Sequence, residues 1–402
     1  MLNKLIIFFF ILGVVLVVFL LKNQVSVSSC DYSKASLQRF ENALNTNTTT
    51  PIKVGITYTA DKAFEVKNQD FKHGITLATN IINQNGLLNG RKIELVYKEY
   101  PDDVEEAKKV SREFAENPEI VASISNSNSN IIMGISIDYE FSTLPFIATS
   151  ATDPLLTKET FKYIFRNIPD DILMAKELAK LADNLQYENI VVLHSKSKYG
   201  MLLSSVFIEK GTEFGMNILY RASFSESDRM FKKVVSKISP FENKEIDYDA
   251  IFLVGDFTSV SNLIIQLRES GIYAPIITTN ILDTPEFLKL GKIANSVIVP
   301  TYFSLDILNF TTQEFIKLYQ KEYNKLPNAD AVEGYDAMML LAQAITNAKS
   351  SVPSDISESL KFMDDFQSIS GDYSLNTKGD VVDKKIFFKK VINEDFKFLH
   401  LK

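Results

Sequence analysis

Short apolar runs alternate with amphipathic stretches from residue 52 to the carboxyl end of the chain. The first run covers residues 52–58, and apolar side chains then recur at helical spacing over residues 71–82 before Gly86. This pair predicts a strand followed by a helix. A second helical stripe over residues 104–114 ends before Pro118. Further apolar runs of strand length lie at residues 93–97, 120–124, 144–148, 190–193, 251–254, 275–278 and 297–300.

The alternation of near-continuous apolar strands with helices predicts an α/β fold. Strands that are apolar on both faces belong to parallel sheets covered by helices on each side. A single sheet rarely holds so many units, so we expect two Rossmann-like, doubly wound lobes. Near the C-terminus, residues 371–375 and 385–391 flank the turn Thr377-Lys378-Gly379-Asp380 and predict a closing β-hairpin.

The amino-terminal end has a different pattern. An unbroken apolar run from Leu5 to Leu21 lies between Lys4 and Lys22. This run of 17 residues would span roughly 25 Å as a helix, a length shared by short transmembrane helices and long signal peptides. We therefore expect export, with residues 1–30 as a signal or membrane anchor.

The single cysteine, Cys30, follows Val27-Ser28-Ser29 in a pattern that resembles a bacterial lipobox. Lipidation of Cys30 would anchor the protein to a membrane. Lys22 and the polar gap before Cys30 depart from that pattern, so an uncleaved anchor and an ordinary cleaved signal stay open as alternatives. Residues 31–51 are polar, which predicts a flexible tether between the membrane and the folded body.

Composition narrows the functional classes. The 402 residues are enough for two domains of ordinary size. One cysteine excludes an internal disulfide, and three scattered histidines argue against a zinc site. The net charge of −7 argues against a nucleic-acid partner, which would require a basic surface. The sequence therefore predicts neither a metal nor another cofactor.

Two polar loops follow strands in the first half of the chain. Residues 125–130 read Ser-Asn-Ser-Asn-Ser-Asn after the strand that ends at Ile124, and residues 149–154 follow the strand at 144–148. In open α/β sheets ligands bind beyond the carboxyl ends of the strands, where backbone N–H groups accept anions. Both loops therefore predict a carboxylate site. Ser and Asn are also common helix caps, and Asp153-Pro154 has the pattern of a cap.

Enzymatic signatures do not occur in the sequence. The chain contains no G-x-G-x-x-G after a strand, no G-x-x-x-x-G-K, no H-E-x-x-H and no G-x-S-x-G. Ser195 and Lys198 form S-x-x-K without its companion motifs, and His194 has no assignable nucleophile beside it. We expect a protein without catalytic activity.

Taken in order, these features resemble the type 1 periplasmic binding proteins, specifically the leucine/isoleucine/valine-binding branch that serves ABC importers. The resemblance extends from Ile52 to the C-terminus, and the order and spacing of its motifs carry it. The motifs are the first strand Lys53-Val54-Gly55-Ile56, the segment 86–95, the two polar loops, Phe165-Arg166-Asn167-Ile168-Pro169 with Asp171, Tyr199-Gly200 after a strand, and Gly334-Tyr335-Asp336-Ala337.

The resemblance implies which residues bind the ligand. In this family a Ser of the first loop and a Thr of the second hold the ligand carboxylate. The positions that match are Ser129 or Ser127 in the first loop, and Ser150 with Thr152 in the second. An aromatic residue after the next strand closes over the ligand, and Tyr199 matches it.

Two further positions depart from the family pattern. Phe257 stands where a second aromatic residue, usually Tyr, is expected. Asn280 stands at the position of the acidic residue that binds the α-amine, and an uncharged amide cannot neutralise an ammonium group. Asp256 or Asp283 would then take that role, or else the ligand lacks the amine.

The resemblance also implies a function and a division of the chain. It implies a solute-binding protein of the periplasm or cell envelope that closes on a small carboxylate, such as a branched-chain amino acid, and serves an ABC permease in the inner membrane. A ligand-sensing receptor or regulator of the same fold is the alternative. The first lobe would contain residues 52–168 and 301–350, and the second residues 169–300 and 351–402. The chain would cross between them near residues 168–170, 300 and 350–353.

Overall fold

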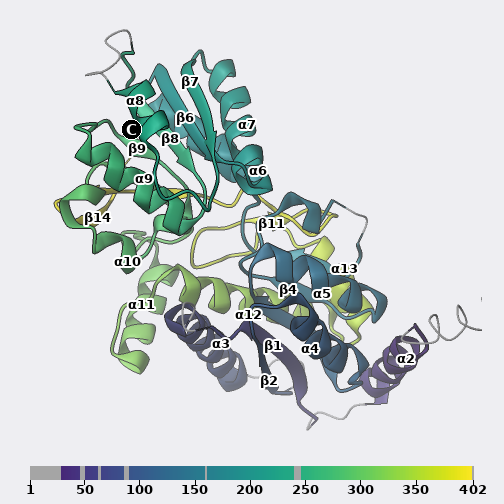
Figure 1. Ribbon diagram of the computed structural model, residues 1–402. Coiled ribbons are helices and arrows are strands. Elements are labelled where there is room, and N and C mark those ends of the chain that lie inside the picture. The colour runs from purple at the N-terminus through teal and green to yellow at the C-terminus, as the bar shows by residue number, and fades with distance from the viewer. Residues whose placement is uncertain are drawn as a thin grey trace, which may run out of the picture.

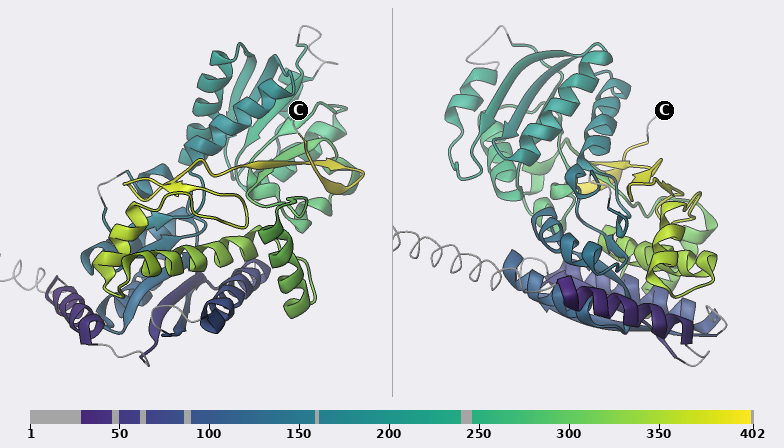
Figure 2. Two further views of the ribbon diagram at one scale, coloured as in Figure 1. Left: turned by 180° about the vertical axis from the view of Figure 1, so that it is seen from behind. Right: turned by 90° about the vertical axis from the view of Figure 1, so that its right-hand side faces the viewer.

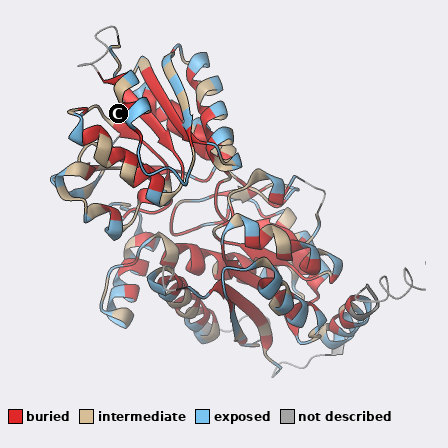
Figure 3. Cartoon of the chain, viewed as in Figure 1, coloured by how far each residue is buried: buried red, intermediate tan, exposed pale blue. Residues whose placement is uncertain are grey.

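The protein folds into two α/β lobes joined by three crossing segments (Figure 1). The computed structural model describes residues 29–45, 50–61, 65–85, 90–158, 161–239 and 246–400. Each lobe is built around its own sheet, and Figure 3 shows buried strands at the centre of both lobes. The expected architecture of two doubly wound lobes is confirmed.

The first lobe contains a five-stranded parallel sheet in the order β2-β1-β3-β4-β5. Its central strands β1 and β3 are buried at every position except Lys53, because helices cover both faces of the sheet. The strands are β1 (Ile52–Thr59), β2 (Ile93–Tyr100), β3 (Ile120–Asn126), β4 (Phe146–Ala148) and β5 (Ile164–Arg166).

Two groups of helices cover the faces of this sheet. One face packs against α3 (Glu65–Asn85), α11 (Phe310–Tyr323), α12 (Ala329–Ala348) and α13 (Pro353–Lys361). The other face packs against α4 (Val104–Glu116) and α5 (Ser129–Phe141). The chain therefore leaves the first lobe, builds the second, and returns to supply α11 to α13.

Two glycines allow α3 and α12 to approach closely. A Cβ atom on Gly74 would lie 1.9 Å from the carbonyl oxygen of Ala331, and one on Gly334 would lie 2.5 Å from that of Phe71. Any larger residue at either position would push the helices apart. This contact holds the amino-terminal half of α12 beside the start of α3, which is the part of the lobe that faces the second lobe.

The second lobe contains a seven-stranded sheet in the order β14-β13-β10-β9-β8-β6-β7. Its strands β6 to β10 are parallel, whereas β13 joins β10 in antiparallel register and β14 pairs with β13. The strands are β6 (Asn189–Ser195), β7 (Asn217–Phe224), β8 (Ala250–Val254), β9 (Ile276–Ile277), β10 (Val297–Thr301), β13 (Phe387–Ile392) and β14 (Asp395–Phe398).

Helices again lie on both faces of the second sheet. Helices α6 (Asp171–Asn184) and α7 (Lys198–Glu213) cover one face. The other face carries α8 (Lys232–Ile238), α9 (Phe257–Glu269) and α10 (Pro285–Leu288). The short helices η2 (Pro154–Leu156), η3 (Asn280–Leu282) and η4 (Gly291–Ala294) lie in connecting loops.

The third crossing lies about thirty residues later than the sequence predicts. The chain passes to the second lobe after β5 and returns to the first lobe after β10. However, α13 and residues up to Val381 pack in the core of the first lobe, and the chain reaches the second lobe at Phe387. The assignment of residues 351–402 to the second lobe is therefore wrong for residues 351–382. Figure 2 shows this last part of the chain, in yellow, passing from one lobe to the other.

The closing hairpin also differs from the expectation. The strands β11 (Ser374–Leu375) and β12 (Val381–Val382) pair across the expected turn. Residues 385–391, which were expected to supply the second strand, form most of β13 in the second lobe instead. The turn docks on β5, where Arg166 forms an ion pair of 2.7 Å with Asp380.

Residues 29–45 form helix α2, which packs against α4 and α5 (Figure 2). Tyr32 is 4% exposed and donates a hydrogen bond of 2.8 Å to Asp138. The guanidinium of Arg39 is buried and donates to the carbonyl oxygens of Phe114, Ala115 and Ser142, which lie at the carboxyl ends of α4 and α5. The expected flexible tether is thus wrong for residues 31–45.

The expectations for the apolar amino-terminal run fall outside the described residues, which start at Ser29. Within the part of the chain that the structure describes, no helix has the length and apolar character to cross a membrane. Cys30 belongs to the first turn of α2.

Candidate ligand-binding site

The carboxyl ends of the strands in the two lobes point toward each other across the junction (Figure 1). An ion pair of 2.7 Å joins Asp153 in the loop after β4 to Lys198 at the start of α7. The backbone of the same first-lobe loop also accepts a hydrogen bond of 2.9 Å from the amide of Asp171 at the start of α6, through the Thr152 carbonyl. The two polar loops of the sequence therefore face the second lobe.

Ser127 holds the first polar loop in place from inside the lobe. Its hydroxyl accepts a hydrogen bond of 2.9 Å from Thr59 and lies 3.0 Å from the phenol oxygen of Tyr100. Its carbonyl oxygen accepts a bond of 3.3 Å from the Ser150 hydroxyl. Ser127 is buried, so its direct contribution is to the shape of the loop.

Ser129, Ser150 and Thr152 link the two polar loops to each other. The Ser129 hydroxyl accepts hydrogen bonds from the backbone amides of Thr152 at 3.1 Å and Asp153 at 3.2 Å. Ser150 and Thr152 are partly exposed toward the junction. Lys67, at the start of α3, lies 3.4 Å from the Ser150 hydroxyl and 3.6 Å from Asp330. A cation and a partly exposed hydroxyl thus stand together, as a carboxylate site requires.

Tyr199 lies in the first turn of α7, opposite these loops. Ser197 caps the helix through the amide of Gly200. A Cβ atom on Gly200 would lie 2.4 Å from the Ser195 hydroxyl, so only glycine lets the helix begin this close to β6. The Tyr199 phenol lies beside Asp171 and Thr279, and burial together with the Asp171 charge raises its pKa. Tyr199 is therefore placed beside two polar groups of its own lobe, Asp171 and Thr279.

The other residues expected to bind the ligand have different surroundings. Phe257 begins α9 and packs, partly buried, against the core of the second lobe. Asn280 begins η3, and its carbonyl accepts the amide of Asp283. Asp256 caps α9 through the amides of two following residues. Asp283 forms an ion pair of 3.0 Å with Lys389 on β13. Neither aspartate is an unpaired partner for an amine.

Sequence reasoning missed three acidic groups and one phenol at the junction. Burial raises the pKa of Glu333 on α12 to about 8 and the pKa values of Asp171 and Asp330 to about 6. The phenol oxygen of Tyr302, just after β10, is buried and has no hydrogen-bond partner within the described residues. The charges of Glu333 and Asp171 both act on Tyr302, so these groups share one region.

A signal for this region does exist in the sequence. Glu333 directly precedes the motif Gly334-Tyr335-Asp336-Ala337, and Asp330 lies one helical turn earlier on the same face. Acidic residues at this spacing in an otherwise apolar helix are unusual for a core and point to a functional face.

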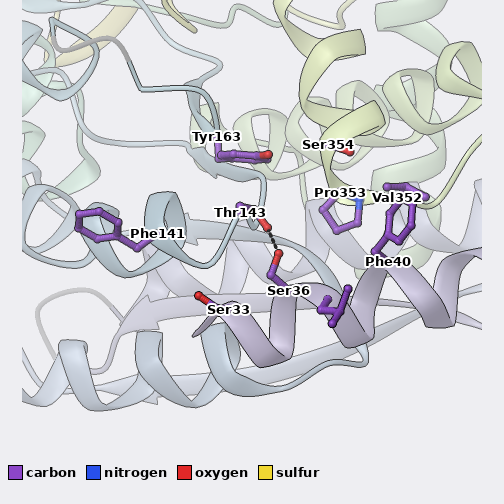
Figure 4. Close-up of a pocket in the computed structure, with 10 residues that line it drawn as sticks. Ser33, Ser36, Phe40, Phe141, Thr143, Tyr163, Val352, Pro353 and Ser354 are labelled. Carbon is purple, nitrogen blue, oxygen red and sulfur yellow. Dashed lines mark hydrogen bonds between the residues drawn. The ribbon is translucent and has the colours of Figure 1, made fainter. Parts of the chain in front are cut away.

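A separate pocket lies at the far end of the first lobe (Figure 4). It has a volume of about 420 Å³ and is lined by α2, the end of α5 and the start of α13, including Phe40, Phe141 and Pro353. The hydroxyls of Ser36 and Thr143 meet at its floor, 2.5 Å apart. This pocket lies away from all residues expected to bind the ligand.

The arrangement of two lobes with polar loops facing across a three-segment hinge agrees with comparisons to known proteins. The sequence pattern of the Periplasmic binding protein family matches residues 51–395. The chain belongs to this family. The match begins after α2, so the docked helix lies outside the part that the family pattern describes.

Individual members of the family give a more detailed picture. The chain is 23% identical over 330 residues to the Leu/Ile/Val-binding protein homolog 1 of Brucella abortus, covering 82% of this chain and 86% of that protein. An ABC transporter substrate-binding protein of Desulfitobacterium hafniense, solved in complex with Leu, has a TM-score of 0.77 at 24% identity and covers 87% of this chain and all of that one.

A third relative binds a different kind of ligand. An ABC transporter solute-binding protein of R. palustris, solved with benzoate, has a TM-score of 0.72 at 16% identity, over 87% of this chain and 96% of that one. Proteins of this fold are therefore known with an amino acid and with an acid that carries no amine. The fold of this chain is that of periplasmic binding proteins solved with either kind of acid.

Proposed function

We propose that this protein is an exported solute-binding protein that closes its two lobes around a small carboxylate ligand, a branched-chain amino acid or a related compound, and delivers it to an ABC importer. The observation that carries the proposal is the convergence of buried polar groups without partners at the junction. The Thr279 hydroxyl from the second lobe, the Tyr302 phenol from the hinge and one oxygen of Asp171 lack hydrogen-bond partners among the described residues. Such groups are costly unless a ligand satisfies them.

The carboxylate of the ligand would bind on the first lobe. The Ser150 hydroxyl and the Lys67 ammonium lie 3.4 Å apart, and Ser150 belongs to the loop whose Asp153 contacts the second lobe. Tyr199 would close over the ligand from the opposite side. Binding energy would then favour the closed arrangement, in which Asp153 and Lys198 are paired. A closed protein presents a surface to the permease that the open protein lacks.

A thermal shift measurement tests the ligand class. The purified protein is heated with each of the amino acids, short amides, urea and hydroxy acids at several concentrations. A ligand that binds only the folded protein raises the melting temperature in proportion to the logarithm of its concentration. We expect at least one amino acid or other small carboxylate to do so. If no carboxylate in the panel raises the melting temperature, the proposed ligand class is wrong.

A sensory receptor of the same fold is the second candidate. The apolar run Leu5–Leu21 supports it, because a persistent anchor suits a detector that signals to a membrane partner, whereas a lipidated Cys30 suits a transporter component. Mass spectrometry of the protein isolated from its native membrane separates the two. An intact Met1 supports the receptor, and a lipid on Cys30 as the first residue supports delivery to an importer.

A further inference from the structure

Glu333 carries a buried carboxyl group that forms no ion pair with a described residue. The residue is 7% exposed, and the hydrogen bond found for it among the described residues is made by its backbone, not by its carboxyl group. The backbone carbonyl oxygen of Glu333 accepts a hydrogen bond of 2.9 Å from the side-chain amide of Asn167, which lies in the first crossing. A buried carboxylate in this state is costly and is uncommon in folded proteins.

The cations nearest to Glu333 are occupied elsewhere. Lys67 pairs with Asp330 at 3.6 Å. Lys384, in the third crossing, donates its hydrogen bond of 2.7 Å to the carbonyl oxygen of Asn167. Both lysines still act on Glu333 over a longer range, as do the carboxylates of Asp330 and Asp336. The protein's own groups thus leave room for one more positive charge at Glu333.

The neighbouring polar atoms face the same region. Tyr302 is 3% exposed, and its hydroxyl has no hydrogen-bond partner within the described ranges. Among the charged groups around it, Glu333 has the strongest effect on the pKa of its phenol. Asp171, with one unpartnered oxygen, acts on both Tyr302 and Tyr199. Because Tyr199 also lies beside Thr279, these groups connect Glu333 to the residues expected to bind the ligand. Both lobes and the hinge therefore contribute polar groups to one region around Glu333 and Tyr302.

We propose that Glu333 receives the positively charged nitrogen of the ligand, with the Tyr302 hydroxyl beside it, and that the ligand is therefore an amino acid rather than an acid without an amine. This inference rests on the proposed function and names the ligand class at the same site. The Ser150 hydroxyl, which lies 3.4 Å from the Lys67 ammonium, would take the carboxylate of the amino acid, and Glu333 would take its ammonium group. The carboxylate that Asn280 cannot supply from the second lobe comes instead from α12 in the first.

The protonation of Glu333 gives this site a distinct signature. Burial, followed by the charge of Asp330, raises its pKa to about 8, while Lys67 and Lys384 act in the opposite direction. Glu333 is therefore mostly protonated at neutral pH in the ligand-free protein. A bound ammonium group favours the charged carboxylate, so binding should release roughly one proton at pH 7.

The test compares pairs of probes that differ by the amine alone. Isothermal titration measures the binding of L-leucine and 4-methylpentanoate, and of every other amino acid that raised the melting temperature beside its amine-free acid. Each titration is repeated in two buffers of different protonation enthalpy, which yields the number of protons released. The variants are Glu333→Gln, which keeps the shape of the side chain, and the exposed control Glu322→Gln on α11.

The outcomes separate this inference from the proposed function. We expect the amino acid of a pair to bind, its affinity to fall at least about tenfold in E333Q, and the proton release to disappear in that variant but not in E322Q. The inference is overturned if E333Q and the wild type bind the amino acid with equal affinity, or if only the amine-free acids bind. In both of these cases the proposed function still stands. If no carboxylate probe binds, the proposed function fails and the inference fails with it.

Discussion

Lys384 donates a hydrogen bond of 2.7 Å to the backbone carbonyl oxygen of Asn167, and so ties the third crossing segment to the first. The lysine is buried, and its ammonium lies 4.6 Å from the centre of the Tyr373 ring. The nearby Asp336 is the first of the acidic groups that favour the charged form of this lysine. The hinge of this protein is therefore held by a buried cation rather than by flexible chain alone.

Replacing Lys384 by methionine should destabilise the protein. The change keeps the length of the side chain but leaves the Asn167 carbonyl without its donor and Asp336 without its nearest cation. We expect the free energy of unfolding to fall by about 3 kcal/mol, as when one partner of a buried charged pair is removed. Urea denaturation measures this loss. The matched control is Lys385→Met, which alters an exposed neighbour and should change the free energy by less than about 0.5 kcal/mol.

Helix α2 should add stability to the first lobe through Arg39. Its guanidinium is 1% exposed and donates to three carbonyl oxygens at the carboxyl ends of α4 and α5, where the helix dipoles favour a cation. Arg39→Met should cost about 2 kcal/mol and raise the rate of amide hydrogen exchange in α2. The exposed Lys34→Met is the control. Equal exchange rates in both variants would show that α2 is held without Arg39.

The stability of the ligand-free protein should fall as the pH rises. Burial raises the pKa of Glu333 from 4.5 to about 8, so between these values the native protein binds more protons than the unfolded chain. The contribution of Glu333 to the free energy of unfolding is complete below pH 4.5 and is lost as the pH rises through about 8. Glu333→Gln removes this dependence, so the variant should gain stability over the wild type by a few kcal/mol between pH 5 and pH 8.5. A constant difference across that range would contradict the assignment.

Tyr199 should matter for ligand binding more than for folding. Tyr199→Ala removes the aromatic ring that stands between Asp171 and Thr279. We expect the affinity for the best ligand of the panel to fall at least about tenfold, as loss of a buried aromatic contact does. The control is Tyr273→Ala, which removes a ring that is 72% exposed in the same lobe. A loss of affinity that is equal in the two variants would place the ligand elsewhere.

The sequence predicted the fold well where strands are apolar on both faces. It missed β7 because this edge strand alternates exposed and partly buried residues, so it lacks a continuous apolar run. It missed α2 for another reason. The deepest contact of that helix is made by Arg39, a residue that hydropathy counts as polar, and its partners are backbone carbonyls that no side-chain pattern reveals.

The candidate site could be predicted only in part. Loops after strands were found because strand ends are visible in the sequence, and the structure shows that Ser129 joins them through two backbone amides. Capping by Asp256 and pairing of Asp283 with Lys389 depend on local geometry and on a strand more than a hundred residues away. Glu333 was missed because its importance comes from burial and from the absence of a partner, which only the packed structure reveals.

The most direct test of the account is a crystal structure of the protein with the ligand that raises its melting temperature most. We predict electron density for that ligand between the lobes, with its carboxylate near Ser150 and Lys67 and its opposite side against Tyr199. Density in the pocket beside α2, or a ligand that touches one lobe only at its outer surface, would contradict the account.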